Sequence, residues 1–248
     1  MQVSMDESLV LPPPPPLAEI DRSALFLDFD GTLVAIADTP DAIEVPADLA
    51  ARLGSLATRM NGRLALISGR AVDDLGQHLG AMSFALAGSH GTERYGADGA
   101  LIGDEPAPIP PDVNEALREF AEREGVMYER KPHGGALHFR AHPERMEAVN
   151  RFAEKLAREH GLSVKVGKQV TELVYPGVDK GGAVRAFMHN AEFTGATPVF
   201  IGDDLTDEDG FAAAADLGGF GVIVGNRRPT AARYQLASVA QVHQWLGL

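Results

Sequence analysis

The chain has 248 residues, of which 45% are hydrophobic, so it can bury a sizeable core and wholesale disorder is excluded. Asp and Glu number 35 against 22 Lys and Arg, and the resulting charge of −13 argues against a nucleic-acid-binding protein. The absence of cysteine excludes disulfides and thiolate chemistry. No apolar run approaches the roughly 18 residues of a membrane helix, and the N-terminus lacks signal-peptide features, so we expect a cytoplasmic protein without membrane partners.

The N-terminal half begins with a proline-rich segment and continues as alternating strands and helices. Residues 1–21 contain the run Pro12–Pro16, which favours polyproline II, and we expect a flexible tail. Short apolar runs then alternate with amphipathic patterns, which predicts a Rossmann-like, doubly wound parallel sheet. The expected strands are 24–27, 63–67 and 84–87, and the expected helices are 48–60 and 72–79.

A group of prolines at 106–111 marks a change of pattern. The next elements are expected to be a helix at 112–124, strands at 126–131 and 136–140, a helix at 143–160, and strands at 162–166 and 171–175. The first pattern then resumes, with helices at 182–189 and 211–215 and strands at 198–201 and 221–224. We therefore predict one discontinuous α/β core, 22–107 with 179–248, and an inserted α/β cap domain at 108–178 with one open sheet face.

The segment Asp28–Leu33 reads Asp-Phe-Asp-Gly-Thr-Leu and follows an apolar strand. Strand alternation points Asp28 and Asp30 the same way, at the strand end where parallel sheets bind ligands. Two carboxylates this close repel each other unless a cation or a shared proton intervenes. Thr32 fits a phosphate site, and Gly31 allows a tight turn. This context favours chemistry over a solvated turn.

Further polar residues follow other predicted strands or begin helices. Asp203, Asp204 and Asp207 form an acidic cluster that suits Mg²⁺, although acids at a helix start are a common alternative. Ser68 could bind a phosphate oxygen or simply cap a helix. Lys180 is weak evidence by itself, but it too begins a predicted core helix.

These four segments, in this order, resemble the haloacid dehalogenase superfamily of phosphatases. The resemblance covers about 22–107 and 179–248, and the insertion resembles the larger α/β cap of that superfamily. A closer similarity is to trehalose-6-phosphate phosphatases. The motifs that carry it are Ala-Gly-Ser-His-Gly-Thr-Glu at 87–93, Glu-Arg-Lys-Pro at 129–132, His-Phe-Arg at 138–140, Gly-Lys at 167–168, Glu172, Asp-Lys-Gly at 179–181, and Gly-Asp-Asp-Leu-Thr-Asp-Glu at 202–208.

The resemblance implies phosphoryl transfer through an aspartyl phosphate. Asp28 would attack phosphorus, and Asp30 would protonate the leaving sugar oxygen and then activate water. Mg²⁺ would be held by the Asp28 carboxylate, the Asp30 carbonyl and Asp203, with Asp204 or Asp207 in support. The phosphate oxygens would be held by Thr32, Ser68 and Lys180.

Sugar recognition is expected chiefly in the cap. Glu129 and Lys131 alternate onto one strand face, and His138 and Arg140 are expected to do the same. Such side chains on an open face are often merely solvated. The family resemblance implies a substrate-binding set of Gly69, Arg70, His90, Gly91, Glu129, Lys131, His138, Arg140, Lys168 and Glu172.

Three functions stay open at this point. The first is hydrolysis of trehalose 6-phosphate, a small-molecule sugar phosphate. The second is another capped enzyme of the superfamily, such as a sucrose-phosphate or mannosylglycerate-phosphate phosphatase, or a phosphosugar mutase. The third is a catalytically silent regulatory domain that binds sugar phosphates, although Asp28, Asp30 and Asp203 are all present. The sequence also leaves open an association with a trehalose-phosphate synthase.

Overall fold

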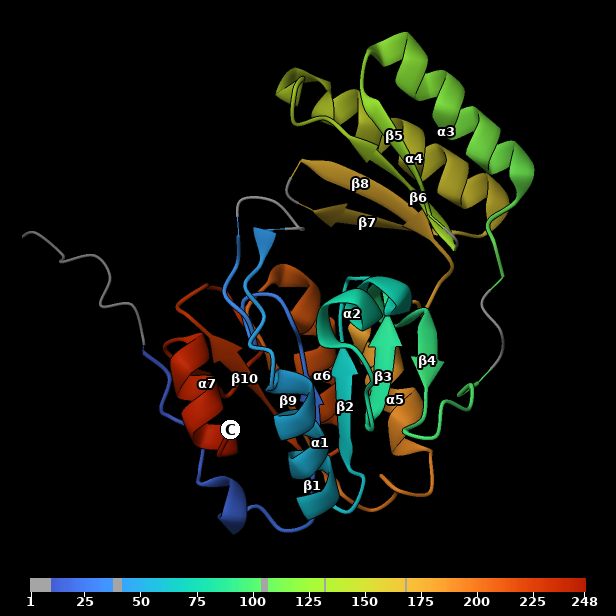
Figure 1. Cartoon of the computed structure of the whole chain (residues 1–248). Coiled ribbons are helices and arrows are strands. Elements are labelled where there is room, and N and C mark those ends of the chain that lie inside the picture. Colours follow the sequence, from blue (N-terminus) through green and yellow to red (C-terminus); the bar gives the residue numbers. More distant parts are fainter. Residues whose placement is uncertain (1–9, 38–41, 104–106, 132, 168) are drawn as a thin grey trace, which may run out of the picture. The chain divides into compact units, whose positions relative to one another are not determined.

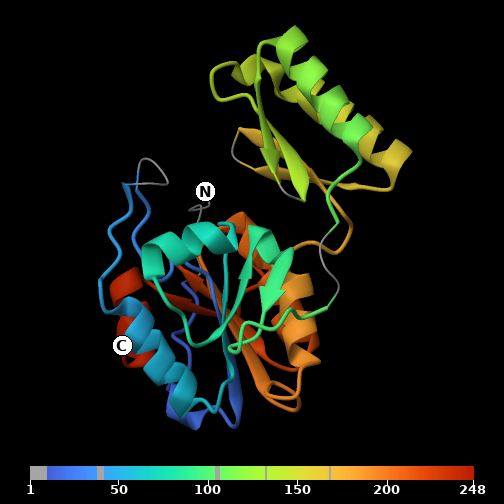
Figure 2. The same ribbon diagram turned by 45° about the vertical axis from the view of Figure 1, so that its right-hand side comes forward.

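The computed structural model describes residues 10–37, 42–103, 107–131, 133–167 and 169–248. Its contacts divide the chain into two compact units (Figures 1 and 2). The core unit combines the residues up to 104 with 179–248, and the inserted unit spans 105–178. Among the described residues, no helix has both the length and the apolar character needed to cross a membrane.

The core unit is built on a seven-stranded sheet in the order β11-β10-β9-β1-β2-β3-β4. All neighbouring pairs are parallel except β3 and β4, which confirms the predicted parallel α/β class. The edge strands β4 and β11 were not predicted, because each is only three residues long. The strands are β1 (Ser23–Leu27), β2 (Leu64–Ile67), β3 (Ala85–Gly88), β4 (Glu93–Tyr95), β9 (Thr197–Gly202), β10 (Phe220–Val224) and β11 (Tyr234–Leu236).

Helices cover both faces of this sheet (Figures 1 and 2). Alternate residues of β1 belong to opposite core clusters: Leu25 packs with α1, α2 and α7, whereas Phe26 packs with α5 and α6. The central strands are buried on both faces and therefore read as continuous apolar runs. The helices are α1 (Leu49–Arg59), α2 (Val72–Leu79), α5 (Lys180–Met188), α6 (Glu208–Asp216) and α7 (Val239–Leu246), with 3-10 turns at Leu17–Glu19, Ser89–Gly91 and Leu205–Asp207.

Part of the N-terminal segment packs against the core unit, which differs from the predicted flexible tail. The indole Nε1 of Trp245 donates to the carbonyl of Pro15 at 2.9 Å, and the amide of Gln235 donates to the carbonyl of Pro12 at 3.0 Å. Leu11 packs on the α5/α6 side and Leu17 on the opposite side. Residues 11–17 therefore pass around the β11 edge of the sheet.

The inserted unit is a four-stranded antiparallel sheet, β5-β6-β8-β7, with two helices packed on one face. Its strands are β5 (Met127–Lys131), β6 (Gly134–His138), β7 (Ser163–Gly167) and β8 (Val170–Val174); its helices are α3 (Pro111–Glu124) and α4 (Met146–His160), preceded by a 3-10 turn at Pro143–Arg145. The prediction placed Arg140 on the same strand as His138, which is wrong, because β6 ends at His138 and Arg140 lies in the turn that follows.

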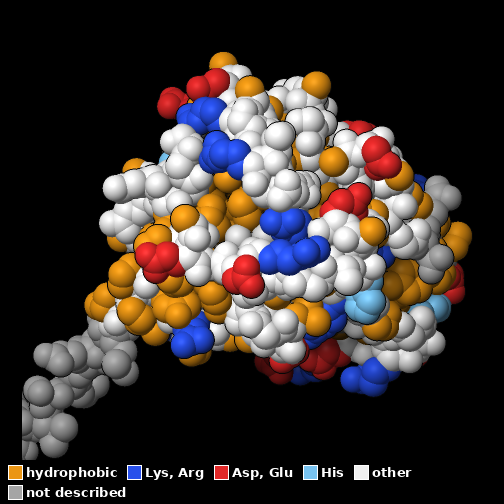
Figure 3. Space-filling view, turned by 90° about the horizontal axis from the view of Figure 1, so that it is seen from below, with side chains coloured by type: hydrophobic (Ala, Val, Ile, Leu, Met, Phe, Trp, Pro, Cys, Tyr) orange, Lys and Arg blue, Asp and Glu red, His pale blue; other side chains and the backbone are white. Residues whose placement is uncertain are grey.

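Charged side chains of both signs are mixed on the face shown in Figure 3. On that face, the described Lys and Arg side chains lie singly or in small groups between apolar, acidic and uncharged ones. They do not form a continuous basic stripe there.

Candidate active site

The acidic segments meet at one end of the core sheet because their strands are neighbours. Asp28 follows β1 and Asp203 follows β9, and the two strands pair in parallel. The amide of Asp28 donates to the carbonyl of Ile201 at 2.9 Å, which extends this pairing to the strand end. Residues 170 or more apart in sequence are thereby placed in one site.

A buried lysine lies between two of the carboxylates. The Nζ of Lys180 donates to Asp28 Oδ1 and to Asp207 Oδ1, each at 2.6 Å. Lys180 and Asp28 are only 3% and 4% exposed, and Asp207 is fully buried. The predicted helix at 182–189 begins earlier, at Lys180, because the Asp179 side chain caps it by accepting from the Gly182 amide.

Burial and mutual repulsion control the protonation of this cluster. Burial, followed by the charge of Asp207, raises the pKa of Asp28 well above its usual range, against the opposing effect of Lys180. Burial, with repulsion from Asp207, raises the pKa of Asp203 to about 6. Burial disfavours the charge on Lys180, but Asp207 and Asp28 outweigh it and raise the pKa of this ammonium. The lysine stays charged, and the carboxylates have more negative charge than it can offset.

Asp28, Asp203 and Asp207 form a group that could hold a metal ion, since each offers an oxygen within 4.8 Å of the others. Oxygen donors with uncompensated negative charge suit a hard divalent cation. Both oxygens of Asp207 are already used, one by Lys180 and the other by the amides of Asp203 and Asp204. Asp28 and Asp203 are therefore the available ligands, and Asp207 supports them. Asp204 lies outside this group, exposed at the start of the turn Leu205–Asp207.

Gly31 permits the close approach of Asp203. Its φ of +79° is in the region that favours glycine, and a Cβ there would lie 2.3 Å from Asp203 Oδ2. Any side chain at this position would push the Asp203 carboxylate away from Asp28. The Oγ1 of Thr32, which is fully buried, lies 3.5 Å from Asp203 Oδ1.

Asp30 is held by Arg70, which was predicted to bind substrate. The guanidinium donates to both carboxylate oxygens, through Nε at 2.7 Å and through Nη2 at 2.9 Å. A third nitrogen, Nη1, donates to Asp74 at 2.8 Å. The hydrogen bond to Asp30 is the main reason why the pKa of Arg70 is raised. Arg70 thus contacts Asp30, the predicted acid. The contact of Arg70 with a substrate stays a prediction.

Ser68 and the turn Ser89–Gly91 lie side by side at the ends of β2 and β3. Ser68 is fully buried, and its carbonyl accepts from the amide of His90 at 2.9 Å. The His90 ring lies against Gly69, where a Cβ would be 2.6 Å from its Cε1. A Cβ on Gly91 would lie 2.6 Å from the carbonyl of Asp179, so glycine lets this turn approach the start of α5.

In the inserted unit, four of the predicted sugar-binding side chains form one hydrogen bond and one ion pair on the sheet face opposite the helices. Glu129 pairs with His138 at 2.7 Å, and Lys131 pairs with Glu172 at 2.8 Å. The register explains these contacts as diagonal ones. Glu129 lies opposite Ala136, two positions from His138, and Glu172 also lies opposite Ala136, two positions from Gly134, the partner of Lys131. Lys168 lies outside the described residues.

Sequence reasoning missed Arg227, which follows β10. Its Nε donates to the carbonyl of Asp203 at 3.3 Å. The signal was indirect: β9 and β10 are parallel neighbours, so the residues that follow them meet at the same end of the sheet.

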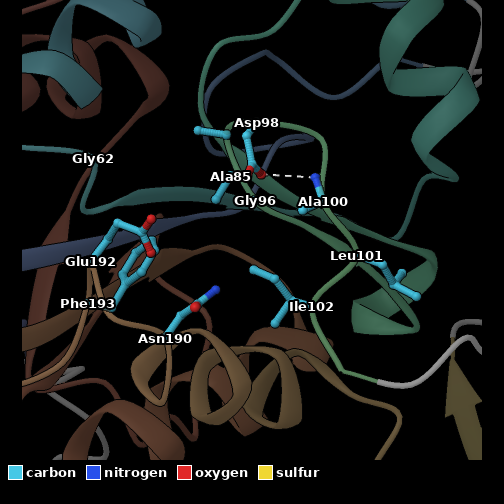
Figure 4. A pocket seen from close by; sticks show the side chains of 11 residues that line it. Gly62, Ala85, Gly96, Asp98, Ala100, Leu101, Ile102, Asn190, Glu192 and Phe193 are labelled. Carbon is cyan, nitrogen blue, oxygen red and sulfur yellow. Dashed lines mark hydrogen bonds between the residues drawn. The ribbon is translucent and has the colours of Figure 1, made fainter.

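A separate pocket of about 200 Å³ in the core unit does not belong to this site. Gly62 precedes β2 and Ala85 begins β3, so the pocket lies at the opposite end of the strands from Asp28 and Ser68. Figure 4 shows Asn190, Glu192 and Phe193 on one side of it and Leu101 and Ile102 on another.

Comparison with known proteins identifies the family. The family model described as trehalose-phosphatase matches residues 26–240. The chain belongs to this family of phosphatases. It is 40% identical over 228 residues to the trehalose-6-phosphate phosphatase of Escherichia coli (strain K12). The aligned segment covers 91% of this chain and 85% of that relative. These matches confirm the predicted resemblance to trehalose-6-phosphate phosphatases. A solved phosphatase of the haloalkanoate (HAD) superfamily, 18% identical with a TM-score of 0.67, has the same fold.

Two solved structures show the same fold at low sequence identity. The trehalose-6-phosphate phosphatase C-terminal domain of C. albicans has a TM-score of 0.75 and 23% identity, covering 93% of this chain and 92% of that one. The C-terminal domain of the Candida albicans trehalose synthase regulatory protein has a TM-score of 0.73 and 15% identity, covering 96% of this chain and 99% of that one. Because a regulatory protein shares the fold, the fold alone does not establish catalysis.

Proposed function

We propose that this chain is a Mg²⁺-dependent phosphatase that hydrolyses trehalose 6-phosphate to trehalose and inorganic phosphate. Family membership supports phosphatase chemistry, and the name of the Escherichia coli relative supports the substrate. The observation that best supports catalysis is the buried cluster in which Lys180 donates to Asp28 and Asp207 beside Asp203. Burying these charges is costly, and a silent regulatory domain would have no need to retain them.

The first half of the reaction is attack by Asp28 on phosphorus. A carboxylate oxygen of Asp28 forms a bond to phosphorus while the bond from phosphorus to the sugar oxygen breaks. Asp30 gives its proton to the leaving oxygen. Arg70 donates to both oxygens of Asp30, so these hydrogen bonds must open before Asp30 can hold and transfer that proton.

The second half releases inorganic phosphate. Asp30 takes a proton from water, whose oxygen attacks phosphorus while the bond between phosphorus and the Asp28 oxygen breaks, which restores the Asp28 carboxylate. The Asp28 carboxylate, the Asp30 carbonyl and Asp203 would hold Mg²⁺, which would supply positive charge to offset repulsion between the substrate phosphate and the protein. Lys180, Thr32 and Ser68 hold the phosphate oxygens, and Gly69, His90 and Gly91 shape the adjoining surface.

We assign sugar recognition to the inserted unit, which we expect to be the cap domain. Glu129, Lys131, His138 and Glu172 present paired polar groups on one sheet face, and carboxylates and ammonium groups bond sugar hydroxyls well. Arg140 and Lys168 complete the proposed set. A cytoplasmic location and an association with a trehalose-phosphate synthase stay hypotheses.

The direct test is phosphate release from a panel of sugar phosphates, with and without Mg²⁺. Trehalose 6-phosphate should be the best substrate, and a chelator should abolish its hydrolysis until Mg²⁺ is returned. Equal rates on sucrose 6-phosphate, or full activity in chelator, would contradict the assignment. A mutase would instead return the phosphoryl group to sugar and release no inorganic phosphate.

A further inference from the structure

The turn that carries Asp203 has its backbone groups bonded from two sides. On one side, Asp207 Oδ2 accepts from the amides of Asp203 and Asp204 at 2.9 and 2.8 Å. On the other side, Arg227 donates to the carbonyls of the same two residues, through Nε at 3.3 Å and Nη2 at 3.2 Å. The two side chains therefore bond both amides and both carbonyls of this two-residue segment, and the Asp204 carbonyl also accepts from the Asp207 amide at 3.1 Å.

Arg227 is itself held in place. Its Nη1 donates to the carbonyl of Pro229 at 3.0 Å, and its Nη2 pairs with Glu208 at the start of α6. The other oxygen of Glu208 accepts from the amide of Ala231 at 2.6 Å. Arg227 and Glu208 thus join the segment after β9 to the segment after β10.

The planar guanidinium suits this task better than an ammonium. Arginine presents its donors in a fixed fork, so Nε and Nη2 can reach two successive carbonyls at once. Lysine would keep the charge but concentrate it at one point on a flexible stem. The contact pattern therefore depends on the shape of the side chain as well as its charge.

We propose that Arg227 is a positioning residue for the metal site, because it clamps the Asp203–Asp204 backbone so that the Asp203 carboxylate is presented beside Asp28. This inference rests on the proposed function for its metal. Arg227 contacts backbone oxygens and Glu208, and it acts through Asp203. Residues that orient metal ligands in this indirect way typically change metal affinity about 10–100-fold when they are replaced.

The test is the Mg²⁺-dependent rise in Tm of the full chain, which yields a dissociation constant without any turnover. Arg227→Met should weaken Mg²⁺ binding at least about 10-fold. Arg227→Lys should weaken it nearly as much, because lysine lacks the fork of donors. The matched control is Arg185→Met, which removes an arginine paired with Asp216 at 2.9 Å on the exposed surface of the same unit. It should bind Mg²⁺ like the parent chain.

Activity supplies the second measurement. In Arg227→Met, the Mg²⁺ concentration for half-maximal turnover should rise by the same factor, and kcat should recover largely at saturating Mg²⁺. If Arg227→Met does not fold, Glu208→Gln tests the same clamp, and it should weaken Mg²⁺ binding in the same direction.

Wild-type Mg²⁺ affinity in Arg227→Met, or in Glu208→Gln where that variant is used, would overturn the clamp. A parent chain whose Tm does not respond to Mg²⁺ would overturn it as well. A parent chain that binds Mg²⁺ but leaves trehalose 6-phosphate intact would refute the proposed function instead. The Mg²⁺-dependent rise in Tm, compared between the variant and the parent chain, would still show whether Arg227 positions Asp203.

Discussion

The core unit and the inserted unit both carry lysine–carboxylate pairs, but in different environments. Lys180 is 3% exposed between Asp28 and Asp207. Lys131, paired with Glu172, has a side chain that is 27% exposed on an open sheet face. Separating buried charges from their partners is costly, so they stay fixed in place, whereas accessible ones can exchange partners for a ligand. The difference suggests fixed chemistry in the core unit and adjustable recognition in the inserted unit.

The largest effect is expected at the nucleophile. Asp28→Asn keeps the shape of the side chain but removes the attacking charge, so kcat should fall at least about 10³-fold with trehalose 6-phosphate. The measurement is steady-state phosphate release, with circular dichroism as the check on folding. Substantial turnover in a folded preparation would remove Asp28 from this role.

The same substitution in the two units tests the comparison directly. Lys180→Met leaves Asp28 and Asp207 buried without a counter-charge, so unfolding free energy should fall by about 3–5 kcal/mol. Lys131→Met removes one accessible pair and should cost about 1 kcal/mol or less. Urea denaturation at pH 7 measures both. Equal losses would show that the two pairs do not differ as their burial indicates.

Protonation should affect the stability of the metal-free protein through Asp203. Its folded pKa of about 6 is above the unfolded value of roughly 3.9, so this group stabilises the fold below about pH 4 and that stability is lost as pH rises through 6. In chelator, Asp203→Asn should therefore gain stability relative to the parent chain by about 1.4 kcal/mol per pH unit between these values.

Denaturation curves at pH 4 and pH 6.5 check this expectation. Added Mg²⁺ should stabilise the parent chain at the higher pH and have little effect on Asp203→Asn. A difference that does not change with pH would mean that Asp203 carries the same charge in the folded and unfolded states.

Much of the fold and the identity of the core residues could be predicted from the sequence. The central strands are buried on both faces and end at polar residues, so their apolar runs locate Asp28 and Ser68 at the strand ends. The helix α7 was missed, although Ser238 provides an N-cap and Val242 and Leu246 recur at helical spacing. Edge strand β11 was also missed, because it has only three residues.

Other features depend on side-chain geometry that no motif encodes. The hydrogen bonds from Arg70 to Asp30 join residues 40 apart, and those from Arg227 to Asp203 and Asp204 join residues 24 and 23 apart. Their existence depends on which rotamers the packed strands allow. The strand containing His138 was shifted because the small residues Gly134 and Gly135 pair in β6, although glycine disfavours strands.

The most direct test of the account is the ratio of two activities in variants of the inserted unit. Glu129→Ala, Lys131→Ala and Glu172→Ala should each lose about 1–3 kcal/mol in kcat/KM with trehalose 6-phosphate, the scale for hydrogen bonds to charged groups. Slow hydrolysis of a small aryl phosphate, which offers no sugar hydroxyls, should hardly change, and Asp28→Asn should abolish both. If both activities fell equally in the three variants, these side chains would support folding or chemistry, and the assignment of sugar recognition to the inserted unit would be contradicted.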